Sequence, residues 1–383
     1  MHNTKAHFST FCFSVLLTLC VCATSYAESW SDNLFVNGYF TLDISTADTN
    51  LNTVSSVGEM REFKEDKVSI KNSLIGGQLE YQFTDNLSLF AQGVAYYDKE
   101  GSTTTDINWA YLSYDFDYDI KARAGVFQTP FLQGTELRTI GYSRLWARPL
   151  TPGTGASGIN EYTGISLIKQ MPVADYNWEF QLAAGQGKHD LDEVDVDGLQ
   201  LLSAKVQHEY FWLRMAALHA EYAVFTPRGQ LIIDSGDIFM GSIETEVSLG
   251  NTIVNAGFSK SDSKVTPNDI MYYLSLGYRF NDFTPFVMWN KRNQLFEPFD
   301  VPRPPNPPQP GQPPNPGSQQ PRQTPDGNAD MYSFGAGFRW NFAPHLAIKV
   351  QAESIRTSDD TGRSNSVEQS SGSIFTLVVE GAF

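Results

Sequence analysis

The sequence SSGSIFTLVVEGAF, residues 370–383, decides the fold. In a β-strand, successive side chains point to opposite faces. One face of this stretch is apolar and aromatic: Phe375, Leu377, Val379, Gly381 and Phe383. The other face carries Thr376, Glu380 and Ala382. An unpaired carboxylate costs several kcal/mol in an apolar core, whereas a wall between lipid and water accepts both faces. The stretch therefore predicts one strand of a transmembrane β-barrel.

Such a barrel must be closed, because an open sheet edge would leave backbone N–H and C=O groups without partners in lipid. Residues 34–44, LFVNGYFTLDI, alternate in the same way, with Gly38 and Phe40 on the apolar face and Tyr39 and Asp43 on the polar face. We expect this first strand to pair with the last one. Phe383, within that last strand, is then expected to be needed for assembly.

The same alternation recurs along the chain. It predicts 16 strands: 34–44, 75–83, 87–97, 107–116, 120–131, 161–171, 176–186, 199–209, 211–225, 238–249, 252–261, 270–280, 283–293, 331–342, 346–357 and 371–383. Every second connection is short, such as 84–86, 117–119 and 281–282, and the others are long and polar. This asymmetry is typical of periplasmic turns and extracellular loops. The predicted fold class is all-β, an antiparallel transmembrane β-barrel of about 16 strands.

Residues 1–27 predict a secretory signal peptide. Lys5 precedes an apolar run at 11–22, and Ala27 ends a small-residue cleavage site. The run is shorter than the roughly 18 to 20 residues of a membrane anchor. We expect cleavage after Ala27, with residues 28–383 forming the barrel domain. The mature chain then has no cysteine, because Cys12, Cys20 and Cys22 all lie in the leader.

The chain is acidic, with a formal net charge of −16. Loss of the leader removes one lysine and no acid, so the mature charge is −17. Nucleic-acid binders need a basic face, so this balance argues against nucleic acid as a partner.

A proline-rich segment, residues 298–325, holds 12 of the 20 prolines. Proline donates no hydrogen bond to a strand ladder, so we expect no strand there. Its place among the long connections predicts an extracellular loop of polyproline character. Recognition by a partner that binds PxxP motifs is the alternative.

Several stretches together resemble the Gram-negative outer-membrane porin family: FVNGYF (35–40), YQFTDNLSLFAQ (81–92), WAYLSYDF (109–116), IKARAGVFQTPF (120–131), the long connection 128–160 and the final Phe383. The resemblance implies a homotrimer of 16-stranded barrels in the outer membrane, surrounded by lipid and lipopolysaccharide. It also implies a third extracellular loop that folds inward, and recognition of the last strand by the barrel-assembly machinery. Passive diffusion of small hydrophilic solutes and ions, with no cofactor and no enzymatic activity, follows from the same resemblance.

The connection 128–160 departs from that family. An acidic PEFGG-type tip is absent, and the connection instead carries Glu136, Arg138, Arg144 and Arg148. Arginine is permanently charged, so three arginines facing a lumen would attract anions. Alternatively, they pair with Glu136, Glu161 or carboxylates of the wall and hold the loop.

Strand alternation also predicts the charged residues of the pore wall. The inward positions are mixed in sign: Asp43, Glu80, Lys121, Arg123, Lys205, Arg279, Arg339 and Lys349. Further inward acids are Glu179, Glu244, Glu246, Glu353 and Glu380. We expect a weak anion preference from the loop arginines, and cation preference from the wall acids is the rival expectation.

Other chemistry has weaker support. The acidic run 193–198 resembles a calcium loop, but position 12 of that pattern falls on Ala204 instead of a glutamate, so no metal site is expected. His189 beside Asp190 is the one candidate for a hydrolase. The alternative function is a surface protein, either an adhesin, a receptor or a barrel hydrolase, that acts through its long loops. A barrel of about 16 strands favours a channel, because smaller barrels are filled by side chains.

Overall fold

The structure, a computed structural model, describes residues 32–54, 60–97, 101–148, 159–189, 194–225, 231–263, 268–296, 300–301, 322–323, 327–359 and 368–383. The expected signal peptide, 1–27, lies outside the described residues. So do Asp190 and most of the proline-rich segment.

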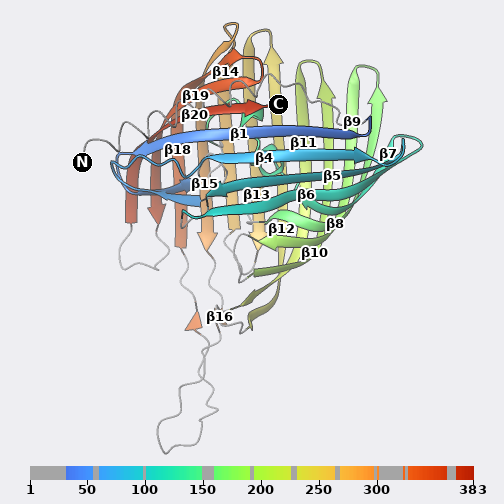
Figure 1. Ribbon diagram of the computed structural model, residues 1–383. Coiled ribbons are helices and arrows are strands. Elements are labelled where there is room, and N and C mark those ends of the chain that lie inside the picture. The colour runs from blue at the N-terminus through green and yellow to red at the C-terminus, as the bar shows by residue number, and fades with distance from the viewer. Residues whose placement is uncertain are drawn as a thin grey trace, which may run out of the picture.

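Sixteen of the described strands form one closed antiparallel barrel (Figure 1). In barrel order from the N-terminus they are β1 (Leu34–Ala47), β4 (Leu74–Gln82), β5 (Leu87–Tyr97), β6 (Thr103–Phe116), β7 (Ile120–Gln128), β8 (Ile159–Val173), β9 (Tyr176–His189), β10 (Val194–His208), β11 (Phe211–Phe225), β12 (Leu231–Leu249), β13 (Thr252–Ser263), β14 (Asn268–Tyr278), β15 (Phe283–Phe296), β18 (Gly327–Ala343), β19 (Leu346–Asp359) and β20 (Glu368–Ala382). Each pairs with its neighbours along the chain, and β20 closes on β1. The predicted 16-stranded barrel is confirmed.

The connections hold elements that strand alternation did not predict. β2 (Leu51–Val54) and β3 (Met60–Phe63) form a hairpin after β1. A short helical turn, α2 (Gln133–Glu136), and a 3-10 turn, η1 (Gly141–Ser143), follow β7.

Two predictions about strand positions were wrong in detail. β7 ends at Gln128 instead of 131, because Pro130 lacks the N–H that a ladder needs. The proline-rich segment was expected to hold no strand, yet β16 (Asp300–Val301) pairs with β17 (Arg322–Gln323). Neither of these two-residue strands contains a proline, so their N–H groups are free to pair.

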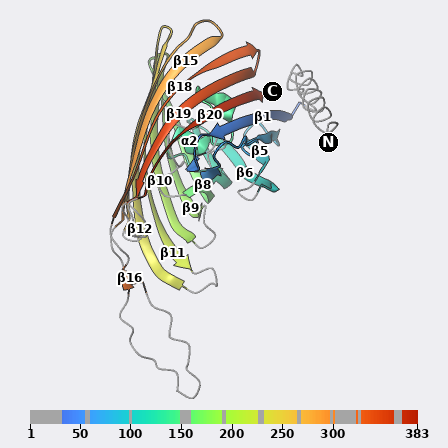
Figure 2. The same ribbon diagram turned by 90° about the vertical axis from the view of Figure 1, so that its left-hand side faces the viewer.

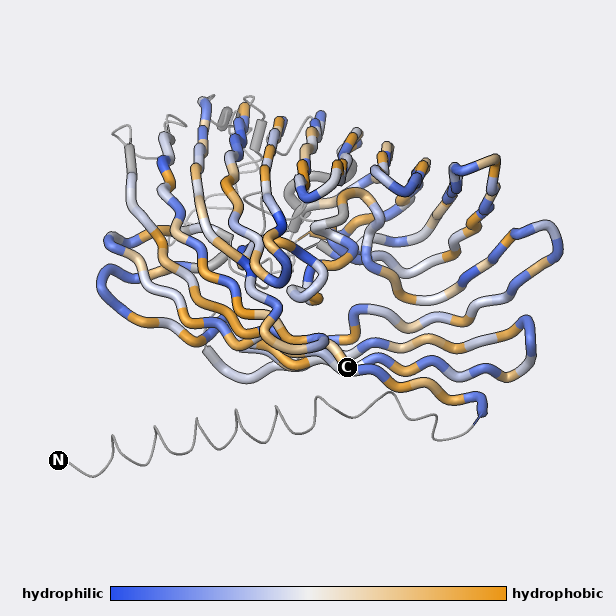
Figure 3. Tube along the Cα trace, turned by 90° about the horizontal axis from the view of Figure 1, so that it is seen from above, coloured by the Kyte–Doolittle hydropathy of each residue, from blue (hydrophilic) through white to orange (hydrophobic). Residues whose placement is uncertain are grey.

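Along the barrel strands, hydrophobic and hydrophilic residues alternate (Figure 3). On the outer face, Phe375 is 48% and Leu182 is 56% exposed. On the inner face, Thr376, Glu380 and Lys349 are each 0% exposed. The outer face is therefore apolar, and the buried charged side chains point inward. This is the arrangement of a membrane barrel.

Exposed aromatic residues form a band at each end of the apolar face. At the short-turn end these are Phe83, Phe116, Tyr118, Tyr210, Phe280, Trp340 and Phe383. Towards the long connections they are Tyr272, Trp289, Tyr332, Phe334 and Phe375. Paired aromatic bands mark the two interfaces of a membrane-spanning barrel. Within the described residues, no helix has the length and apolarity to span a membrane.

The seam between β1 and β20 closes the barrel (Figure 2). Phe383 extends it by one residue: the Gly38 amide donates to the Phe383 carbonyl at 2.6 Å, and the Phe383 amide donates to the Gly38 carbonyl at 2.8 Å. The Phe383 ring lies directly over Gly38, where an added Cβ would be 2.5 Å from ring atoms. The pairing of first and last strands is confirmed, and Gly38 provides the space for the aromatic ring.

We expect Phe383→Asp to reduce barrel assembly several-fold, because a carboxylate would replace the ring on the apolar face of the seam. The measurement is the fraction of protein that keeps its compact mobility in unheated SDS gels. Phe83→Asp is the matched control, since Phe83 is 50% exposed in the same aromatic band but lies outside the seam. Equal assembly of the two variants would contradict a special role of the seam.

Candidate functional site

The connection between β7 and β8 is described as far as residue 148, and residues 129–148 are called here the inner segment. Pro130 ends the strand, and the Thr135 hydroxyl then fixes a tight turn. It donates to the carbonyls of Thr129 and Leu132, both at 2.7 Å, and accepts from the Leu132 amide at 3.1 Å. This turn directs the following residues away from the sheet.

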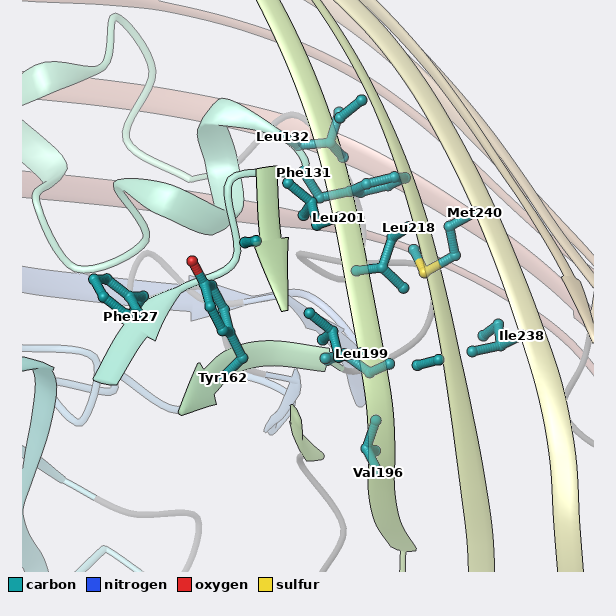
Figure 4. Packing of buried hydrophobic residues seen from close by; sticks show 14 of the residues in the cluster. Phe127, Phe131, Leu132, Tyr162, Val196, Leu199, Leu201, Leu218, Ile238 and Met240 are labelled. Atoms are coloured by element: carbon teal, nitrogen blue, oxygen red, sulfur yellow. The ribbon is translucent and has the colours of Figure 1, made fainter. Parts of the chain in front are cut away.

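Apolar side chains attach the inner segment to β10–β12. Phe131 and Leu132, 1% and 3% exposed, belong to a cluster with Leu199, Leu201 and Leu218 (Figure 4). The Ser242 hydroxyl also donates to the Phe131 carbonyl at 2.6 Å. The neighbouring Leu202 is 51% exposed on the outer face, so this cluster lies on the inner face of the wall.

A charged group strengthens the same contact. Arg214 of β11 lies 2.7 Å from Glu136 of the inner segment and 3.7 Å from Glu244 of β12. Tyr273 donates to Glu244 at 3.1 Å. Arg214 was not among the predicted site residues. Its inward position between Leu213 and Met215 was a signal that strand alternation offered.

Two wall cations hold the other end of the inner segment. Lys349 of β19 is 0% exposed, forms an ion pair with Glu380 at 2.5 Å, and donates to the Gly141 carbonyl at 2.8 Å. Arg339 of β18 donates to the carbonyls of Tyr142 and Arg144, both at 2.8 Å. Gly141 fits because it has no side chain: an added Cβ would lie 2.1 Å from a Glu380 oxygen.

Two of the three predicted loop arginines, Arg144 and Arg148, lie at this contact. Arg148, 3% exposed, faces Glu353 at 3.6 Å and donates to Thr53 of β2 at 3.2 Å. Arg144 is 6% exposed. Burial lowers the pKa of its guanidinium, and the Glu380 carboxylate opposes that shift. Arg138 is half-buried.

A polar group in the middle fixes the inner segment to β1, β5 and β6. The Thr139 hydroxyl accepts from Asn108 at 3.0 Å and lies 3.2 Å from the Tyr39 hydroxyl. Gln92 donates to Tyr39 at 3.0 Å. Together with the contacts above, the inner segment touches inward side chains of β1, β5, β6, β11, β12, β18 and β19, which belong to opposite sides of the closed barrel.

The predicted wall residues fall into two groups. Asp43, 1% exposed, accepts from Ser45 at 2.5 Å, and Lys349 and Arg339 are engaged by the inner segment. The others keep more contact with solvent: Lys121 pairs with Asp115 at 3.3 Å, while Glu80, Arg123, Lys205 and Arg279 are half-buried or exposed. Among the described residues, no group of three metal-ligating side chains was found. The hydrolase candidate, His189 beside Asp190, is not fully described, because Asp190 lies outside the described residues.

No family model matches the sequence, and no curated protein is found similar to it. Solved structures do match the fold. The DcaP channel of Acinetobacter baumannii aligns at TM-score 0.56 and 11% identity, over 94% of this chain and 100% of that one. An anion-selective porin from Comamonas acidovorans aligns at 0.58 and 10%, over 91% and 99%.

The trimer form of OmpT, an outer membrane protein of Vibrio cholerae, aligns at TM-score 0.54 and 11% identity, over 92% of this chain and 100% of that one. The chain has the fold of the outer-membrane porins. At such low identities, the comparisons concern the fold.

We expect Lys349→Met to lower the free energy of unfolding by about 3–5 kcal/mol, because it leaves the Glu380 carboxylate buried without its cation. The double variant Lys349→Met/Glu380→Leu should lose less, since no charge then remains buried. Urea unfolding in detergent, followed by tryptophan fluorescence, measures both.

Lys121→Met is the control, because its ion pair with Asp115 is about half exposed and such pairs contribute about 1 kcal/mol or less. A double variant as unstable as Lys349→Met would show that the buried charge is not the cause.

Proposed function

We propose that this protein is an outer-membrane porin of a Gram-negative bacterium: a water-filled channel for passive diffusion of small hydrophilic solutes and ions. The observation that carries the proposal is the inner segment, which is fastened to inward side chains on opposite sides of a 16-stranded barrel. A barrel of this size leaves an aqueous lumen. A segment that is attached across this lumen narrows it and does not have to fill it.

The proposal extends to assembly and surroundings. The fold neighbour from Vibrio cholerae is described as a trimer, and we propose a homotrimer here. The apolar outer face with its two aromatic bands suits outer-membrane lipid and lipopolysaccharide. The seam at Phe383 suits recognition by the barrel-assembly machinery.

We further propose a weak anion preference. The inner segment and the wall side chains bound to it bring together six cations: Arg138, Arg144, Arg148, Arg214, Arg339 and Lys349. Five carboxylates oppose them: Glu136, Glu161, Glu244, Glu353 and Glu380. The balance is +1 within a chain whose net charge is strongly negative. Because most of these groups are paired, the field left for a passing ion is small.

Single-channel recording in a planar bilayer tests the function. We expect purified protein to conduct KCl, and its reversal potential in a KCl gradient to show a small anion preference. Arg138→Gln/Arg144→Gln should shift that potential towards cations, because two charges leave the narrow region.

Arg356→Gln is the control, as it makes one such substitution at an exposed arginine beside the outer-face residues Trp289 and Phe334, and it should leave the reversal potential unchanged. Folded protein without conductance would refute the channel and favour a surface protein that acts through its long connections. A cation-selective wild type would refute the anion preference alone.

A further inference from the structure

A stack of aromatic rings lies on the inner face of β5–β8. Phe90 stacks on Tyr111 with centroids 5.2 Å apart, Tyr111 on Phe127 at 5.1 Å, and Phe127 on Tyr162 at 5.1 Å. Several inward positions elsewhere on these strands are polar, such as Gln92, Ser113 and Ser166, although Val94 and Ile168 are apolar. The presence of four adjoining aromatic rings on the lumen side of the barrel wall therefore requires an explanation.

Half of the stack has a packing role. Phe127 and Tyr162, 1% and 0% exposed, belong to the apolar cluster that contains Phe131 and Leu132 of the inner segment (Figure 4). Phe90 and Tyr111 lie at the other end and are only half-buried. They border a cavity of about 680 Å³ that also touches the short turn at residues 117–119. Tyr111 also packs against this cluster, through Phe127, but packing of the inner segment does not account for Phe90.

The backbone is built to bring the rings together. Gly125 of β7 faces Tyr111 of β6 in the register and has φ +147°. A Cβ at this position would lie 2.1 Å from the Ala110 carbonyl oxygen and 2.7 Å from the Tyr111 Cα. Only glycine fits this close approach, so β7 sits tight against β6 where Tyr111 meets Phe127.

The polar side chains at the cavity carry both signs. The Arg123 guanidinium lies 5.2 Å from the Tyr111 and Phe127 ring centres and donates to Ser166 at 3.4 Å. Glu80 and Glu179 supply carboxylates to the lining, and Gln170 donates to Glu179 at 3.5 Å. With Asp115, Asp117, Asp119 and Lys121, the lining holds five carboxylates and two cations, so it disfavours anions and offers an excess of acceptors to hydroxyl groups.

We propose that this cavity is a binding subsite for a neutral, ring-shaped polyhydroxylated solute of monosaccharide size. The apolar C–H face of such a ring packs on Phe90, the end ring of the stack, because Phe90 and Phe127 already cover the two faces of Tyr111. Its hydroxyl groups bond to Glu80, Glu179 and Arg123, which together offer the acceptors and donors that hydroxyls require. The subsite rests on the proposed channel function and specifies the solutes that interact with the wall during passage.

The test compares glucose with sorbitol, its acyclic polyol, in single-channel recordings. Both are neutral and similar in size, but only glucose presents a ring face. For wild type we expect glucose to reduce the KCl current at a several-fold lower concentration than sorbitol does. Phe90→Leu should raise the half-blocking glucose concentration about 3- to 10-fold, the range expected for loss of one aromatic contact. Phe334→Leu, at an aromatic residue 58% exposed on the outer face, is the matched control and should leave the block unchanged.

Each block is expressed as a fraction of the same variant's KCl current, so a change in conductance does not imitate a change in binding. Glu179→Gln is a second variant that keeps the rings and should weaken the glucose block as well. Wild-type channels that conduct KCl but respond equally to glucose and sorbitol would overturn the subsite and leave the porin function intact. Block by the ring-shaped cation benzylammonium at lower concentration than by glucose would overturn the neutral class. Absence of any KCl conductance would refute the channel itself, and the subsite with it.

Discussion

Closure of the hydrogen-bond ladder is the constraint on which the rest of this structure depends. A backbone N–H or C=O group in lipid has no water to bond with, so every strand edge must find a partner. The bond pair between Gly38 and Phe383 extends this ladder one residue beyond the β1–β20 register, which ends at Tyr39 and Ala382. Once the wall is closed, its two faces are fixed, and each residue's position in the alternation decides whether it meets lipid or the lumen.

In a closed barrel wall, a buried charge also has a different role from a buried charge in a soluble core. Lys349 and Glu380 would be out of place in a soluble core unless each had a partner, because desolvation of an ion costs several kcal/mol. Here they face inward and bind each other, and Lys349 also donates to the Gly141 carbonyl. A buried pair of this kind contributes little net stability, but it strongly disfavours any other position of the inner segment. These charges therefore mainly fix the position of the inner segment, and they contribute less to the stability of the fold.

Much of the fold could be predicted from sequence because alternation is a local property. Residues 371–383 already show which side chains face lipid, and the same alternation located all 16 barrel strands. The site could be predicted less well. Lys349 was expected on the wall, but its bond to Gly141 joins residues 208 positions apart, and no local pattern specifies that contact. The inner cluster also breaks the alternation, since Leu199 and Leu201 face inward where polar residues are the rule.

That exception explains how the lumen is divided. Leu199, Leu201 and Leu218 face inward because Phe131 and Leu132 cover them, so the apolar inner wall and the inner segment depend on one another. On the β18–β20 side, Lys349 and Arg339 are likewise covered. The inward surface near β4–β7 at the short-turn end stays open to the cavity that Phe90, Tyr111 and Arg123 border. A solute that crosses the proposed channel therefore leaves the charged narrow region and meets a wall of mixed charge and aromatic rings. Selection by charge and selection by shape then act in sequence, at different depths and through different residues.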